Sequence, residues 1–125
     1  MQTTATRVTG IDATYYTVED LPACTEFYSK ILGTGPSVAV PDFFTEWTFE
    51  DGSSFGLYKS EQKPPSRSGS AMFRVADVAA AAAHLKELSA LAMHGDEDYS
   101  EFETCFMAFG NDPEGNQFII HKRKE

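Results

Sequence analysis

Two segments of this chain, far apart in the sequence, repeat each other's order of residues. Val18–Leu21 matches Val75–Val78 at an offset of 57 residues (75 − 18). A second match, at an offset of 63 residues (115 − 52), places Gly52 on Gly115 and their flanking residues on one another. In both copies a strand-like run leads directly into an Asp that can cap a helix. The repeat therefore predicts two copies of one supersecondary unit, which constrains the whole fold.

Each copy has the pattern of a βαβββ module, and the two modules together are expected to form a single domain over residues 1–125. Module one covers about residues 9–60 and module two about residues 70–123, with a proline-containing linker at 61–69 between them. The predicted elements of module one are a strand at Ile11–Val18, a helix from Asp20 to Gly33, and strands at Ser37–Val40, Thr45–Phe49 and Ser54–Lys59. Those of module two are a strand at Ala71–Val75, a helix capped by Asp77, a weak strand around Leu91–His94 and a closing hairpin.

The closing hairpin is centred on the sequence Asp112-Pro113-Glu114-Gly115-Asn116. Pro fixes φ after the Asp, Gly supplies a position with positive φ, and Asp and Asn can bond back to the backbone. Apolar runs flank this segment on both sides, at Cys105–Phe109 and at Phe118–Ile120. The segment is therefore predicted to be a tight turn between two strands.

The composition excludes several classes of protein. An apolar fraction of 42 % and an aromatic fraction of 13 % are typical of a folded domain with a core. The net charge of −9 disfavours nucleic acid as a partner and suits a cationic or neutral ligand, although many acidic proteins are acidic only for solubility. Cys24 and Cys105 are expected to be reduced. The sequence shows neither a signal peptide nor a membrane span, so the cytoplasm is the expected location.

Two motifs resemble those of one known family. These are the segment Phe27-Tyr28-Ser29-Lys30-Ile31-Leu32-Gly33 in the first helix and the Asp-Pro-Glu-Gly-Asn turn before the last strand. With the tandem modules, they resemble the vicinal oxygen chelate superfamily, which includes glyoxalase I, extradiol dioxygenases, fosfomycin-resistance transferases and bleomycin-resistance proteins. The resemblance implies an α+β fold in which the curved mixed sheets of two βαβββ modules form a cup. It also implies a homodimer.

The resemblance further implies where a metal would bind, because enzymes of this family hold a divalent ion with His and Glu from the first and last strands of each module. Counting from the capping Asp and the turn Gly places those positions on Ala13, Gly56, Ser70 and Ile119. None of these side chains is a good ligand for a divalent cation. We therefore expect no metal and no cofactor. An acidic run after His94, from Asp96 to Glu103, is interpreted as a solvated loop.

Strand alternation gives the residues expected to line the cup. The residues predicted to bind a ligand are Ala13, Tyr15, Trp47, Gly56, Tyr58, Ser70, Met72, Arg74, Gln117, Ile119 and His121. The alternation does not fix which face Trp47 takes, and Arg74 is expected on the buried side with an anionic partner. The opposite faces, with Tyr16, Val18, Phe73, Val75, Phe118 and Ile120, are expected to pack beneath the helices. In an alternative interpretation Tyr15, Tyr58 and Met72 simply fill a core.

Small residues at the ligand positions, together with aromatic neighbours, are typical of a binding pocket. The sequence thus predicts a metal-free protein that resembles the bleomycin-resistance type and sequesters a small cationic or aromatic drug or metabolite. No catalytic residue is assigned. The alternative is an enzyme: either a metal-independent isomerase, lyase or hydrolase using Tyr15, Tyr58, Arg74 or His121, or a divergent dioxygenase or lyase of the same superfamily.

Overall fold

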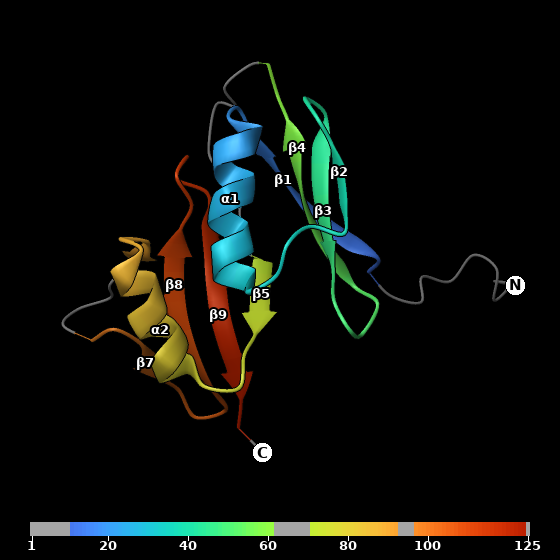
Figure 1. Ribbon diagram of the computed structural model, residues 1–125. Helices are drawn as coiled ribbons and strands as arrows, with labels where there is room; N and C mark the ends of the chain where they lie inside the picture. Colours follow the sequence, from blue (N-terminus) through green and yellow to red (C-terminus); the bar gives the residue numbers. More distant parts are fainter. Residues whose placement is uncertain (1–10, 62–70, 93–96, 125) are drawn as a thin grey trace, which may run out of the picture.

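The computed structural model describes residues 11–61, 71–92 and 97–124 (Figure 1). Predictions for Ser70, His94, Asp96 and nearly all of the linker lie outside these residues. The elements of module one are β1 (Ala13–Val18), α1 (Leu21–Leu32), β2 (Val38–Val40), β3 (Phe44–Thr48) and β4 (Ser54–Lys59). Those of module two are β5 (Ala71–Arg74), α2 (Val78–Glu87), β6 (Leu91–Ala92), β7 (Ser100–Glu101), β8 (Cys105–Asn111) and β9 (Gln117–Arg123). The predicted mixed α+β fold is confirmed.

The strands form one sheet per module in the described part of the chain. The first sheet has the order β1-β4-β3-β2, and the second has the order β5-β9-β8-β6 with β7 also paired to β8. In both sheets the first strand runs parallel to the last one, with Tyr15 opposite Gly56 in module one and Met72 opposite Ile119 in module two. These pairs correspond at the two offsets found in the sequence, so the repeat holds at the level of strand register.

The two modules also share their last turn. In module one the amide of Phe49 donates to the Ser53 carbonyl, and in module two the amide of Asp112 donates to the Asn116 carbonyl. Each turn contains a glycine with positive φ, 89° at Gly52 and 87° at Gly115. A side chain at either position would be strained, which explains why both copies of the turn have Gly there.

Both helices begin where the sequence predicts. The carboxylate of Asp20 accepts a hydrogen bond from the amide of Ala23 at 3.0 Å, and that of Asp77 accepts one from Ala80 at 3.1 Å. The first helix ends at Gly33, which has a φ of 74° and donates its amide to the Ser29 carbonyl. Each capping Asp satisfies a backbone amide that has no partner inside its helix.

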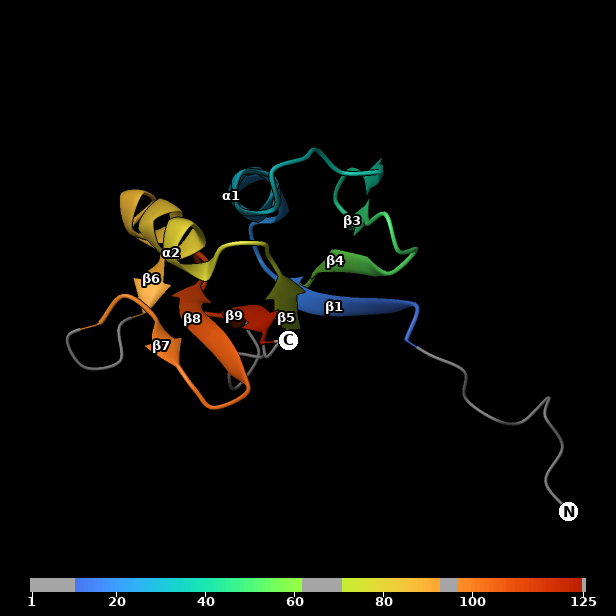
Figure 2. The ribbon, with the colours of Figure 1, turned by 90° about the horizontal axis from the view of Figure 1, so that it is seen from below.

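The helices lie on one side of the sheets, and the other side is uncovered (Figure 2). The core lies between these layers, and the aromatic rings of Tyr16, Tyr28, Trp47, Phe55 and Phe118 are its largest components. The predicted alternation is confirmed, because Tyr16, Val18, Phe118 and Ile120 are buried and Phe73 and Val75 pack against them. No helix in the described ranges is long and apolar enough to cross a membrane.

Polar contacts join the two modules beside this core. The hydroxyl of Tyr16 on β1 accepts a hydrogen bond from the amide of Ala71 at 2.8 Å and donates one to the carbonyl of Gln117. The carboxylate of Glu114, in the last turn, accepts hydrogen bonds from the amides of Glu19 and Asp20. The turn that the sequence singles out thus holds the start of α1 as well as closing its own hairpin.

Two predictions are corrected by the structure. Trp47 is fully buried and contacts Tyr28 and Phe55, so it packs beneath α1 and does not lie on the open face. Its indole N–H donates to the carbonyl of Thr34, so the ring is satisfied in the core. In addition, the acidic segment is not all loop, because Ser100–Glu101 forms β7 against β8.

Candidate functional site

The open face of module one carries the residues of greatest interest. Tyr15 on β1 and Tyr58 on β4 point away from the helices, and their exposed fractions are 39 % and 48 %. On β3, Phe44 lies opposite Tyr58 and Glu46 lies opposite Gly56, so both belong to this face. The interpretation of Tyr15 and Tyr58 as core-filling residues is therefore wrong.

Four aromatic rings enclose a hollow on this face, which we call the aromatic hollow. It is lined by Tyr15, Phe43, Phe44 and Tyr58 and has a volume of about 300 Å³. The ring centroids of Phe43 lie 5.5 Å from Phe44 and 5.4 Å from Tyr58, and those of Tyr15 lie 6.3 Å and 6.5 Å from the same two rings. The four contacts close a cycle, and the planes of neighbouring rings are inclined by 57° to 82°.

Tyr15 is held in place from two sides. Its hydroxyl donates to Oε1 of Glu46 at 2.5 Å. Its ring lies across Gly56, where an added Cβ would be only 2.5 Å from the ring carbons. Burial raises the pKa of Tyr15 to about 12, and the hydrogen bond to Glu46 and the negative charge of Glu46 add to that effect. At neutral pH this tyrosine is a hydrogen-bond donor and has no capacity to act as a base.

This arrangement predicts the titration of the Tyr15 phenol. In the substitution Glu46→Gln the negative charge is lost, so the pKa of Tyr15 falls from about 12 toward its ordinary value while the effect of burial remains. The measurement is phenolate absorbance against pH, with Tyr15→Phe subtracted to isolate the one residue. Glu50→Gln serves as the control for a carboxylate elsewhere. An unchanged Tyr15 midpoint in Glu46→Gln would show that the two side chains do not interact in solution.

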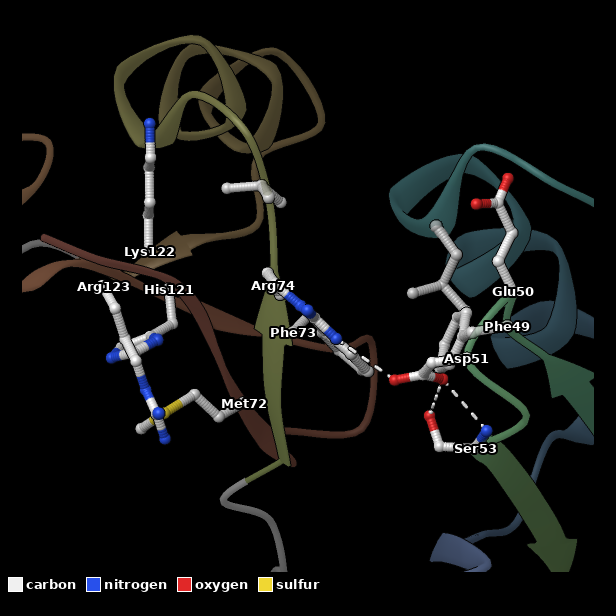
Figure 3. A pocket seen from close by; sticks show the side chains of 12 residues that line it. Phe49, Glu50, Asp51, Ser53, Met72, Phe73, Arg74, His121, Lys122 and Arg123 are labelled. Atoms are coloured by element: carbon white, nitrogen blue, oxygen red, sulfur yellow. Dashed lines mark hydrogen bonds and ion pairs between the residues drawn. The ribbon is translucent and has the colours of Figure 1, made fainter. Parts of the chain in front are cut away.

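A second hollow lies between the modules (Figure 3). Its volume is about 1070 Å³, and its walls come from the end of α1, the β3–β4 turn, β5 and β9. Arg74 donates from its guanidinium to Oδ2 of Asp51 at 3.1 Å, and Oδ1 of Asp51 accepts from Ser53. Those bonds, with the opposite charge of Arg74, lower the pKa of the Asp51 carboxyl. Met72 and His121 lie on the other side of Arg74 in this hollow.

The predicted anionic partner of Arg74 is thus Asp51, but the prediction of a buried-side arginine is wrong. The Arg74 side chain is 79 % exposed and the Asp51 side chain 51 % exposed. An ion pair this exposed contributes at most about 1 kcal/mol to stability. It leaves the guanidinium accessible at the edge of the second hollow.

The structure divides the predicted lining residues between separate places. Tyr15 and Tyr58 line the aromatic hollow, and Gly56 lies beneath the Tyr15 ring. Met72, Arg74 and His121 line the second hollow. The strand positions of Ala13, Gln117 and Ile119 place them on the open faces, where they line neither hollow. The residues that sequence reasoning missed are Phe43, Phe44 and Glu46.

The residues at the implied metal positions do not fit a metal ion. Within the described residues, Ala13, Gly56 and Ile119 bring no donor atoms, and the aromatic ring of Tyr15 takes up the space above Gly56. The described part of the chain contains no group of three or more His, Cys, Asp or Glu side chains arranged to hold a metal. The nearest carboxylate to this position, Glu46, is bonded to the Tyr15 hydroxyl.

Neither cysteine is placed to act as a nucleophile. Cys24 is buried in α1, and its thiol lies 3.5 Å from Oε2 of Glu114. Burial raises the pKa of the Cys24 thiol far above its ordinary value, and the charges of Glu114 and Asp112 raise it further. Such a thiol stays protonated and unreactive. Cys105 is also buried and is not part of a disulfide.

The fold has close counterparts among solved structures. A lactoylglutathione lyase from Agrobacterium tumefaciens is 18 % identical, with a TM-score of 0.72 over 92 % of this chain and 94 % of the other. A glyoxalase/bleomycin resistance protein from Catenulispora acidiphila is 16 % identical, with a TM-score of 0.68 over 90 % of this chain and 97 % of the other. The oxidase ChaP-H1 is 20 % identical, with a TM-score of 0.73 over 94 % and 98 %.

At these identities the similarity concerns the fold alone, and the three names describe different activities. A comparison with curated proteins finds no match. The model of the Glyoxalase/Bleomycin resistance protein/Dioxygenase superfamily matches residues 10–120, which include both modules, both capped helices and the last turn. The chain therefore belongs to the glyoxalase/bleomycin resistance protein/dioxygenase superfamily.

Proposed function

We propose that this protein binds a small organic molecule in the aromatic hollow and sequesters it without transforming it. The observation that carries the proposal is the cycle of four rings on the open face, two of them from tyrosines that are more than a third exposed. Ligand pockets are mostly lined by apolar and aromatic side chains with a few polar groups that orient the ligand. Glu46 and the hydroxyls of Tyr15 and Tyr58 are the polar groups available here. The ligand is a drug or metabolite of cationic or aromatic character.

The alternative, a metal-independent enzyme, has less support. It needs a base or nucleophile beside an acid or an electrophile, within hydrogen-bond reach of one substrate. The candidates are separated, since Tyr15 and Tyr58 line the aromatic hollow while Arg74 and His121 line the second hollow. Tyr15 is protonated at neutral pH. The side chains that favour binding are thus together, and those that favour catalysis are apart.

A thermal-shift panel of aromatic cations, neutral aromatics and aliphatic drugs tests this function. We expect at least one class to raise the melting temperature equally with and without a chelator, because the proposal places no metal between protein and ligand. A ligand at 100 times its Kd stabilises the folded state by about 2.7 kcal/mol. Tyr58→Ala should abolish the shift, while Tyr99→Ala, which removes an exposed ring elsewhere, should retain it. A shift that depends on added metal, or that survives Tyr58→Ala, contradicts the proposal.

We also propose that the protein is a homodimer. The open side exposes the apolar side chains of Val38, Val40, Phe43, Tyr58 and Met72. Exposed apolar surface of this kind is typical of an interface. Light scattering should give twice the mass of 13.8 kDa, and Val38→Glu with Val40→Glu should lower the measured mass toward one chain. A single-chain mass at all concentrations of the unmodified protein would contradict the dimer.

The cytoplasm remains the proposed location. Cys24 and Cys105 are both buried and unpaired, which is usual in a reducing compartment. The acidic surface supports neither a nucleic acid nor a membrane as a partner.

A further inference from the structure

We infer that the aromatic hollow is a cage for an alkylammonium group, with Glu46 as its counter-charge. This inference rests on the proposed function and specifies the chemical class of the ligand. A cation is attracted to the electron-rich faces of aromatic rings, and several rings around one point are the usual way in which proteins recognise methylated ammonium groups. The inference therefore depends on ring geometry, charge and size.

The ring geometry is that of a cage rather than a stack. Each of the four rings contacts two others, and neighbouring planes are inclined by 57°, 82°, 66° and 66° around the cycle. A flat aromatic ligand would need parallel faces between which it could slide. Walls inclined in this way instead suit a compact, rounded group. The hollow of about 300 Å³ is at the small end of the range for ligand pockets.

The charge around the hollow favours a cation. The carboxylate of Glu46 belongs to the same face and is bonded to the hydroxyl of Tyr15, so it reinforces the negative character of the Tyr15 side of the cage. The nearest lysine in the chain to Tyr58 is its neighbour Lys59, whose ammonium pairs with Asp42 at 3.6 Å. The net charge of −9 steers cations toward the protein as a whole.

Two soluble probes of nearly the same shape separate charge from size. Choline carries a trimethylammonium group, and 3,3-dimethylbutan-1-ol carries a neutral tert-butyl group in its place. Both are titrated at constant ionic strength into the full-length protein while backbone amide shifts are recorded by NMR. We expect choline to shift the amides of residues 43–46 and 54–58, with a Kd at least about fivefold lower than that of the neutral alcohol.

Substitutions by leucine remove a ring and keep apolar bulk. Phe43→Leu and Tyr58→Leu should each weaken choline binding severalfold and leave the alcohol nearly unchanged. Phe102→Leu is the matched control, because Phe102 is exposed to 46 % against 48 % for Phe43 but lies outside the hollow. Glu46→Gln should weaken choline binding and reduce its dependence on salt. Gly56→Ala, whose Cβ would press on the ring of Tyr15, should weaken choline binding without removing any aromatic side chain.

The outcomes separate the inference from the proposed function. If the neutral alcohol binds as tightly as choline at the same amides, the cage is wrong and the hollow remains a ligand site. If neither probe shifts those amides while a neutral aromatic from the panel does, the cage is wrong in the same way. If no compound shifts them and Phe43→Leu or Tyr58→Leu changes only the molecular mass, the face is a contact between two copies and both proposals fail.

Discussion

Replacing Trp47 with alanine should remove about 3–5 kcal/mol from the free energy of unfolding. The indole is fully buried between Tyr28 and Phe55, and its N–H donates to the carbonyl of Thr34 at 3.1 Å. Alanine leaves a cavity in the layer beneath α1 and an unpaired carbonyl beside it. Urea unfolding followed by circular dichroism measures the loss.

Tyr58→Ala is the matched comparison for this prediction, because Tyr58 is also an aromatic residue of the module one sheet but points to the open side. With 48 % of its surface exposed, its removal should change the stability by about 0.5 kcal/mol or less. Ligand binding should behave in the opposite way, being lost in Tyr58→Ala and retained by whatever fraction of Trp47→Ala is folded. A small stability loss in Trp47→Ala would return that residue to the open face.

The second large effect is expected at Asp112. This carboxylate is 5 % exposed, and its Oδ2 accepts hydrogen bonds from the Tyr28 hydroxyl and the Asn116 side-chain amide, both at 3.0 Å. Its Oδ1 accepts from the backbone amides of Glu114 and Asn116 at 2.9 Å. Asp112→Ala leaves these buried donors without the partner and should destabilise the protein by about 3 kcal/mol or more. Tyr28→Phe, which removes a single donor to a charged group, should cost about 1.5–3 kcal/mol.

Asp51 is the control for this second prediction, because it lies in the equivalent turn of module one. Its partners are Ser53 and Arg74, and its side chain is 51 % exposed. Water replaces those partners when the carboxylate is removed, so Asp51→Ala should cost less than about 1 kcal/mol. Equal losses at the two turns, measured in the same unfolding experiment, would show that the last turn does not fasten the modules together.

The sequence predicts the fold well because two local signals agree. The capping residues Asp20 and Asp77 and the turn glycines Gly52 and Gly115 occur at constant offsets, and each has a local physical requirement that few other residues meet. Strand alternation then assigns most side chains to a face. These signals are short in range, so one sequence is enough to detect them.

The details that the sequence could not predict depend on neighbours across the sheet. Trp47 could lie on either face until the register of β3 against β4 was known. Phe43 and Phe44 reach the hollow because the chain turns at Asp42, which has a φ of 64°, immediately before β3. The single lining predicted for the ligand became two hollows because Tyr15 covers Gly56 and Arg74 turns to Asp51. Only the packing of side chains on adjacent strands decides these points.

The central claim is that a ligand binds on the open face of module one without a metal. It is tested most directly by mapping backbone amide shifts by NMR as the strongest compound from the panel is added in a chelator-containing buffer. Our account predicts shifts concentrated at residues 43–46 and 54–58, unchanged in extent by the chelator. Shifts concentrated instead at residues 97–103 or 117–123, or binding that appears only after zinc or manganese is added, would contradict it.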